Sequence, residues 1–270
     1  MTKIEWTHRE GTTGVTWNPI TGCTKISEGC KRCYAERMSK RLAGRFGYPA
    51  DDPFRVTVHR DKLDTPFGWR KPRTVFVCSM GDLFHKDVHL STQVNVWRTM
   101  AHTPQHTYIV LTKRADRMAS ALRPLSQTFG TLPNVWLGVT AENQQRANER
   151  IPLLLQAPAA VRFVSVEPML GPVDLRWYLG TGEMLSSHYL DWVIVGGESG
   201  PDARPMHPDW ARGVRDQCVA AGVPFFFKQW GSADQLAGRR AYAIQAGWRP
   251  EEAKGGHLLD GCEHHEWPQT

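Results

Sequence analysis

Apolar and polar positions along most of this chain fall into blocks. Six short apolar runs, rich in β-branched and aromatic residues, each end in polar residues. They are TVFVCSMGDLF (74–84), TYIVLTKRAD (107–116), NVWLGVTAEN (134–143), VRFVSVEPML (161–170), DWVIVGGESG (191–200) and VPFFFKQWG (223–231). Unbroken runs of this kind are typical of strands buried on both faces. Together with a first strand near residues 15–18, they predict about seven strands.

Segments with apolar residues at helical spacing lie between these strands. The predicted helices cover residues 34–46, 91–103 with Ser91 as N-cap, 114–125, 142–156 and 208–222. Strands that alternate with helices at this spacing indicate βαβ units and a parallel sheet. We therefore predict an α/β fold, a complete or partial TIM-like parallel β/α barrel. An open doubly wound sheet is the alternative.

The alternation stops in three places. Residues 46–73 are rich in Pro, Gly and charge and predict an irregular excursion, residues 171–190 leave room for a short helix, and no strand pattern follows residue 232. We predict one barrel domain over residues 1–231, with a cysteine-bearing loop at 21–34. The remaining residues, 232–270, form a C-terminal tail that packs on the barrel.

The polar residues that end each predicted strand are candidates for a binding site, because parallel β/α folds bind ligands at the carboxyl ends of their strands. Six successive ends with acids and bases mixed predict a pocket, although helix N-caps and loop residues are the simpler interpretation, one that suits Asn143 and Ser199. The main candidates are Ser79, Gly81, Asp82, Lys113, Arg114, Thr140, Glu142, Ser165, Glu167, Gly197, Glu198 and Lys228.

Three of the six cysteines crowd together as Cys23-x6-Cys30-x2-Cys33, between the first predicted strand and the first predicted helix. This loop belongs at the same edge as the other strand ends. A metal or redox role suits such a cluster better than a disulfide. Thiolate ligands fit zinc or an iron–sulfur cluster, and the spacing leaves both open. A fourth zinc ligand would come from elsewhere, with His59, Cys78, His85, His89, His257, Cys262, His264 and His265 as candidates.

Charge is distributed unevenly along the 270 residues. Residues 1–73 contain 15 Lys and Arg against 8 Asp and Glu, a net charge of +7, whereas residues 74–270 contain 18 against 19. The basic third is either a face that binds nucleic acid or a solvated surface. Trp69, within FGWRKPR (67–73), is the best candidate there for stacking on a base. We expect no membrane span and no secretory signal, and hence a cytoplasmic protein.

Three cysteines after the first strand of a β/α barrel resemble the radical S-adenosylmethionine (SAM) superfamily, whose usual spacing is C-x3-C-x2-C. A closer resemblance covers nearly the whole chain. WNPITGCTKISEGCKRCYAERM, SMGDLFH, LTKR, GVTAEN, SVEPMLG, VIVGGESG and FFFKQWG, in this order, are similar to a phage-associated three-cysteine-motif family of largely unknown function, regarded as radical-SAM-like.

The resemblance implies a [4Fe–4S] cluster on Cys23, Cys30 and Cys33 that binds SAM at its open iron, and an external electron donor. It also implies the other contacts to SAM. The amino group would meet Ser79, Gly81 and Asp82; the carboxylate Lys113 or Arg114; the ribose Thr140, Glu142, Ser165 and Glu167. The GGESG loop, with Gly197 and Glu198, would form an adenine or substrate wall, and Lys228 completes the set.

The expected function is reductive cleavage of SAM and modification of a substrate, with nucleic acid or a nucleotide as the substrate class, in a phage or mobile-element context. Two alternatives remain open. One is a zinc-stabilised β/α protein that binds nucleic acid or a protein partner without catalysis. The other is a barrel without metal that uses its carboxylates in hydrolysis.

Overall fold

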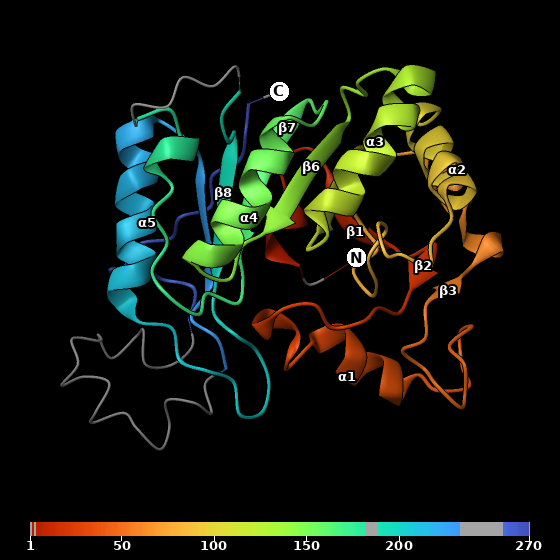
Figure 1. The fold of residues 1–270 in the computed structure, drawn as a ribbon, viewed down its shortest axis with the longest axis horizontal. Coiled ribbons are helices and arrows are strands. Elements are labelled where there is room, and N and C mark those ends of the chain that lie inside the picture. The colour runs from red at the N-terminus through yellow and green to blue at the C-terminus, as the bar shows by residue number, and fades with distance from the viewer. Residues whose placement is uncertain (1, 3, 182–187, 233–255, 270) are drawn as a thin grey trace. The chain divides into compact units, whose positions relative to one another are not determined.

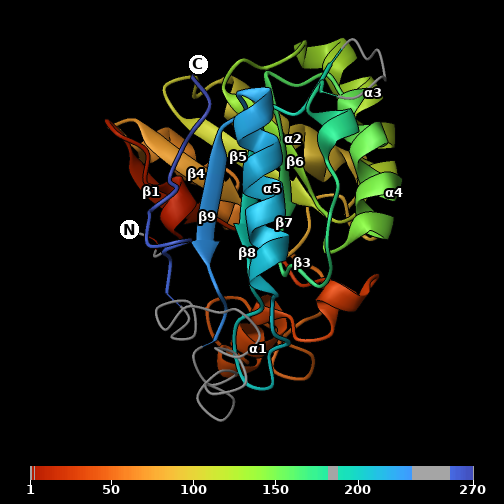
Figure 2. The ribbon, with the colours of Figure 1, turned by 90° about the vertical axis from the view of Figure 1, so that its left-hand side faces the viewer.

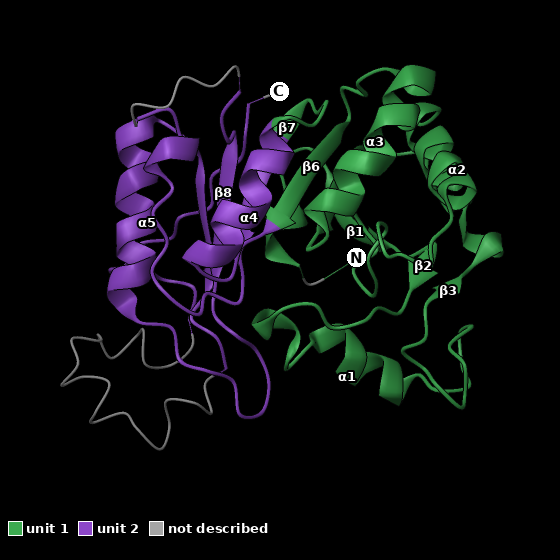
Figure 3. Ribbon diagram, in the orientation of Figure 1, with its two compact units in different colours: residues 1–139, 156–161 green, residues 140–155, 162–270 purple. Residues whose placement is uncertain are grey.

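The computed structural model describes residues 2, 4–181, 188–232 and 256–269 (Figure 1). The chain divides into two compact units (Figure 3). Unit 1 comprises residues 1–139 and 156–161, and unit 2 comprises residues 140–155 and 162–270. None of the helices in these described ranges combines the length and apolar character needed to cross a bilayer.

Unit 1 is built on parallel strands that neighbour each other in the order β1 (Thr13–Trp17), β4 (Arg73–Val77), β5 (Thr107–Thr112) and β6 (Val135–Thr140). The register places Val75 between Val15 and Tyr108. Every residue of β6 is buried, as expected for a strand covered on both faces. The helices α2 (Leu90–Ala101) and α3 (Ala115–Phe129) follow β4 and β5.

Unit 2 repeats this arrangement with β7 (Val161–Val166), β8 (Trp192–Gly196) and β9 (Phe225–Gln229), which are also parallel and adjacent in chain order. Its helices are α4 (Gln144–Leu155) and α5 (Pro208–Ala221). Helix α5 lies alongside β9 (Figure 2). All residues of β7 and β8 are buried, which explains their unbroken apolar sequences.

Strand order decides between the two predicted architectures. A doubly wound sheet reverses its strand order at a switch point, whereas within each unit neighbouring strands follow chain order without reversal. The chain therefore has a mixed α/β fold of the partial β/α-barrel type, and the predicted fold class is confirmed.

Helix positions agree with the predictions in three cases and differ in detail in two. Helix α2 begins at Leu90 with His89 as N-cap, so the predicted cap Ser91 is wrong, because it already lies in the first turn. Helix α1 (Tyr34–Arg41) ends before the predicted residue 46. Phe46 takes a φ of 54° and its side chain is 71% exposed, so it does not belong to the buried face of α1.

The excursion at 46–73 contains only short elements. The strand β3 (Thr57–Val58) pairs antiparallel with β2 (Ile20–Thr21), and the 3₁₀ turns η3 (Arg60–Lys62) and η4 (Thr65–Gly68) follow it. The other 3₁₀ turns are η1 (Glu5–Thr7), η2 (Glu28–Cys30) and η5 (Arg176–Tyr178), the last being the short helix expected within 171–190.

The described end of the C-terminal tail, residues 256–269, lies along β9; residues 233–255 of the predicted tail fall outside the described residues. Phe227 N donates to His264 O over 2.8 Å, and the His265 ring stacks on Phe226 with centroids 4.5 Å apart. Trp192 Nε1 donates to Glu266 O over 2.8 Å. This segment therefore covers backbone groups of β9, as native proteins commonly do at a sheet edge.

Candidate functional site

The cysteine loop begins at a turn that two other segments hold in place. Gly22 pairs with Gly81, after β4, in an isolated parallel bridge. Cys23 N donates to Phe54 O in the excursion over 3.2 Å. Gly22 has a φ of 84°, and a Cβ there would lie 2.2 Å from Arg55 O, so a larger residue would force the segments apart. The first cysteine is therefore placed by both of these segments.

Arg114, just after β5, reaches into the cysteine loop. Its Nη1 donates to Cys23 Sγ (3.2 Å) and to Asp82 Oδ2 (3.0 Å). Its Nη2 donates to Thr24 O (2.9 Å) and Thr24 Oγ1 (3.0 Å). The side chain is almost fully buried. One guanidinium thus ties the cysteine loop to the segments that follow β4 and β5, and the planar fork of arginine suits this work better than a lysine ammonium.

Asp82 is the counter-ion of Arg114 and is only 5% exposed. Both of its carboxylate oxygens accept from Thr112 Oγ1, at 2.8 and 2.9 Å, and Oδ1 also accepts from Phe84 N at 2.9 Å. Ordered donors therefore surround the carboxylate. Contact with the SAM amino group stays a prediction; what the structure shows is that Asp82 anchors Arg114.

The charges in this cluster act on one another. Burial raises the pKa of the Cys23 thiol to about 11, the nearby Asp82 adds to the rise, and Arg114 opposes it. For Arg114, burial works against the charged form, but Asp82 and Cys23 outweigh it and the pKa is raised. Arg114 therefore stays cationic, and Cys23 is a protonated thiol at neutral pH unless a metal displaces its proton.

The other two cysteines lie further along the same loop, Cys30 at the end of η2 and Cys33 at the N-cap of α1. Like Cys23 they are half-buried and outside any disulfide. Cys30 contributes to the raised pKa of Cys23, so their sulfurs lie close enough to interact. In the part of the chain that the structure describes, no three His, Cys, Asp or Glu side chains form a group that could hold a metal ion. The donor chemistry of three thiols on one loop fits zinc or iron–sulfur ligation.

Candidate fourth ligands in unit 1 have other contacts. His59 Nε2 lies 2.8 Å from Thr21 Oγ1, and His85 Nε2 lies 2.8 Å from Thr24 Oγ1. Cys78 is buried, which raises its pKa far above the ordinary thiol value. The candidates His257, Cys262, His264 and His265 belong to the tail segment in unit 2.

At the β6 end, which opens unit 2, Glu142 forms an ion pair with Arg150. Arg150 Nη1 donates to Glu142 Oε2 (2.9 Å) and to Thr140 O (2.8 Å), and both side chains are buried. Arg150 therefore holds the strand end together from within α4. The predicted contacts of Thr140 and Glu142 with ribose stay predictions.

Glu167 and Lys228 are two predicted site residues that the structure brings together. Their side chains form an ion pair between the ends of β7 and β9, and each is only partly buried. A Cβ on Gly196, at the end of β8, would lie 3.3 Å from Glu167 Cδ, so the glycine leaves room for this carboxylate. This pair is the accessible charged group at the strand ends of unit 2 that best fits a ligand role.

The GGESG loop is held by its own contacts. Glu198 is buried and accepts from Arg204 N (2.8 Å) and Arg204 Nε (2.9 Å). Gly197 N donates to Gln229 O over 2.8 Å, and a Cβ on Gly197 would lie 2.1 Å from Trp230 O. The glycine therefore serves the close approach of two backbones, and its contact with a cofactor stays a prediction.

The remaining predicted residues lie at the expected strand ends. Ser79 Oγ donates to Asn18 Oδ1 over 3.2 Å, and the carbonyl of buried Ser165 accepts from Ala141 N over 2.9 Å. Asn143 caps α4 by accepting from Arg146 N over 3.0 Å, as the simpler interpretation held. Lys113 follows β5.

The basic third carries its charges on an irregular surface and on α1. Tyr34, beside Cys33, is 58% exposed. Trp69, the stacking candidate, is half-buried, because the Arg73 guanidinium lies 5.1 Å from its ring centre and His106 packs against it at 5.5 Å. Trp69 is therefore less available to a base than the sequence suggests.

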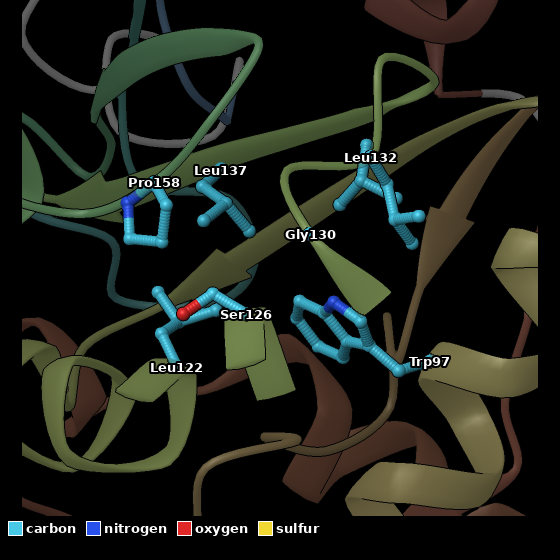
Figure 4. Close-up of a pocket in the computed structure, with 8 residues that line it drawn as sticks. Trp97, Leu122, Ser126, Gly130, Leu132, Leu137 and Pro158 are labelled. Carbon is cyan, nitrogen blue, oxygen red and sulfur yellow. The ribbon is translucent and has the colours of Figure 1, made fainter. Parts of the chain in front are cut away.

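A cavity in unit 1 is too small for a ligand. Its volume is about 10 Å³, room for about one water. Figure 4 shows the side chains around it, which come mainly from α2, α3 and β6. They are Trp97, Leu122, Ser126, Gly130, Leu132, Val135, Leu137 and Pro158.

Fold and site together define a class of protein: a partial β/α barrel with three unpaired cysteines on the loop after β2, held to the ends of β4 and β5 by a buried arginine. Residues 1–268 match the profile of the DUF5131 family, described as a protein of unknown function, and the chain belongs to this family. Neither a curated protein nor a solved structure matches it.

Proposed function

We propose that this chain is an iron–sulfur enzyme of the radical SAM type, with its cluster on Cys23, Cys30 and Cys33. One observation carries the proposal: three unpaired thiols share a loop that Arg114 fastens to the carboxyl ends of β4 and β5. Ligand sites of parallel β/α folds form at this edge. Arg114 also acts against the rise that burial and Asp82 cause in the pKa of Cys23, so it would help to hold a thiolate once a metal displaces the proton.

A [4Fe–4S] cluster on these thiolates would supply one electron, taken from an external donor, to split SAM into methionine and a 5′-deoxyadenosyl radical that takes a hydrogen atom from the substrate. The chain's own residues bind and orient the cysteine loop. Arg114 holds the loop and offsets its negative charge, and Asp82 keeps Arg114 in place.

The proposal assigns SAM to the strand ends. Near the cysteine loop, Ser79, Gly81 and Asp82 would meet its amino group, and Lys113 would meet its carboxylate, since Arg114 is already engaged with Cys23 and Asp82. Within unit 2 taken by itself, the partly buried Glu167–Lys228 ion pair offers an acceptor and a donor to polar groups of a ligand.

Nucleic acid or a nucleotide is the proposed substrate class. The support is the net charge of +7 over residues 1–73, the segment that also carries the cysteines, because phosphates bind basic surfaces. The proposal places the enzyme in the cytoplasm, where thiols stay reduced, within the phage or mobile-element setting that the resemblance implies.

SAM cleavage is the test. Anaerobically reconstituted protein, reduced with dithionite and mixed with SAM, should form 5′-deoxyadenosine, measured by liquid chromatography and mass spectrometry. Cys30→Ala should abolish the product, whereas Cys262→Ala, at an exposed cysteine in the tail, should leave it unchanged. Equal product from the wild type and Cys30→Ala, or none from iron-loaded wild type, would overturn the proposal.

A further inference from the structure

Unit 2 contains an open groove that the SAM proposal does not use. Its volume is about 560 Å³, and it lies between the start of α4 and η5. Five side chains line it: Gln144, Asn148, Asp174, Trp177 and Tyr178. This volume lies within the usual range for small-ligand sites, and the lining combines aromatic rings with amides.

Trp177 provides a stacking surface. Its side chain is 49% exposed, whereas six other tryptophans in the described ranges, Trp192 and Trp230 among them, are buried. The next residue of η5, Tyr178, is largely buried, and its hydroxyl donates to Asn148 Oδ1 over 3.1 Å. An exposed indole can stack on a flat ring, and every nucleobase presents a π-face suited to such stacking.

The hydrogen bonds inside the groove fix the direction of Asn148. Gln144 grips the backbone of Asp174, accepting from Asp174 N (2.6 Å) and donating to Asp174 O (3.2 Å). The Gln144 amide nitrogen then also donates to Asn148 Oδ1 (2.8 Å). Asn148 Oδ1 is therefore the acceptor of two bonds, and its Nδ2 donor has no hydrogen-bond partner within the described ranges of the chain.

The carboxylate that lines the groove, Asp174, is paired with a cation. Arg176 Nε donates to Asp174 Oδ1 over 3.0 Å, and the pair is partly exposed beside Trp177. Arg176, which is next to Trp177 in the chain, engages the Asp174 carboxylate. Among the residues that line the groove, Asn148 Nδ2 is therefore the donor that the groove's own hydrogen bonds leave to a ligand. A sugar ring needs acceptors as well, whereas a base with ring carbonyls needs donors and a stacking face.

We propose that this groove binds a thymine or uracil base, stacked on Trp177 with its O4 carbonyl, the position at which cytosine has an amino group, accepting from Asn148 Nδ2, and with Arg176 near the phosphate. The inference rests on the proposed function only for the substrate class, nucleic acid or nucleotide. It adds to that class a particular type of base and the groove that binds it.

Binding of labelled oligonucleotides tests the site. The probes are single-stranded dT12 and dC12, measured by fluorescence anisotropy in 0.2 M NaCl with the full chain, and thymidine monophosphate, measured by calorimetry. Wild type should prefer dT12. Trp177→Ala should weaken dT12 binding about 5- to 100-fold, and Trp177→Phe should weaken it less, because a smaller ring still stacks. Tight binding of the monophosphate would identify a free nucleotide as the ligand, and binding of dT12 alone would identify a single strand.

Asn148→Asp gives the sharper test. It keeps the oxygen that Gln144 and Tyr178 bind, and replaces the donor by an acceptor. The preference for dT12 over dC12 should fall about tenfold, since cytosine carries an amino donor and thymine does not. Gln127→Glu makes the same charge change on exposed α3 and should leave the preference unchanged.

Three outcomes would overturn the inference: equal dT12 affinity in wild type and Trp177→Ala, an unchanged base preference in Asn148→Asp, or binding of cellotetraose but of no nucleotide. Its failure is separable from that of the enzyme proposal. Colourless protein that binds dT12 through Trp177 would support this site and contradict the iron–sulfur assignment. Iron-loaded protein that does not bind dT12 would support the iron–sulfur assignment and contradict this site.

Discussion

Arg114 Nη1 lies 3.2 Å from Cys23 Sγ, and the same nitrogen lies 3.0 Å from Asp82 Oδ2. One buried cation therefore serves a structural carboxylate and a candidate metal ligand together. The loop with the cysteines cannot leave the ends of β4 and β5 without exposing this charge network or leaving it unpaired. The position of the candidate site thus depends on an electrostatic contact as well as on the fold.

Arg114→Met should be strongly destabilising. It leaves Asp82 buried without its counter-ion, and the loss of one partner from such a pair costs about 3–5 kcal/mol. Urea unfolding followed by circular dichroism measures the change. Arg117→Met removes a cation from an exposed position in α3, the helix that begins after Arg114, and should cost less than about 0.5 kcal/mol. Equal stability of the two variants would show that the Arg114 contacts contribute little.

Cys23 in metal-free protein should resist alkylation at neutral pH. Its pKa is raised to about 11, and only the thiolate reacts. The proton is lost as pH rises, so the iodoacetamide rate at Cys23, measured by peptide mass spectrometry, should still be climbing between pH 9 and 10. A rate that levels off near pH 9, as for an ordinary thiol, would show that burial and Asp82 do not control this sulfur.

Gly197→Ala should destabilise unit 2, because its Cβ would lie 2.1 Å from Trp230 O and the two backbones would have to separate. A cost of about 1–3 kcal/mol is expected from overpacking. Gly213→Ala is the matched control: it lies inside α5, and its Cβ meets nothing within 4 Å. There, alanine should stabilise the helix by about 0.5–1 kcal/mol. Thermal unfolding should move the two variants in opposite directions.

Affinity for single-stranded DNA should fall steeply as salt rises if the basic third binds phosphates. Lys31→Ala, next to the cysteine cluster, should reduce the slope of log K against log salt by about one. Lys86→Ala, an exposed lysine outside the basic third, should leave the slope unchanged. A flat salt dependence in wild type would remove nucleic acid from the substrate proposal.

Local sequence was enough to predict the seven strands of the parallel sheet, because most of their residues are buried, and β6, β7 and β8 are buried throughout. The two-residue strands β2 and β3 gave no apolar run and were not predicted. The end of α1 was missed because Leu42 and Phe46 continue the helical spacing of apolar residues, yet the chain turns after Arg41. Helical spacing alone carries no information about where the backbone must bend toward the excursion.

The sequence predicted which residues lie at the strand ends, but not which of them form hydrogen bonds or ion pairs with one another. Lys113 and Arg114 are equivalent in the sequence, and only the fold shows that Arg114 meets both Asp82 and Cys23. Arg150, which pairs with Glu142, gave no signal, since a separation of this kind is not a helical pair. Trp177 was missed too, because exposure of a single tryptophan depends on tertiary packing.

Metal content of anaerobically purified protein tests the central claim most directly. The claim predicts brown protein that absorbs near 400 nm, with about four irons per chain, lost in each of Cys23→Ala, Cys30→Ala and Cys33→Ala and kept in Cys262→Ala. Colourless protein with one zinc per chain, or iron content that does not depend on these three cysteines, would contradict it.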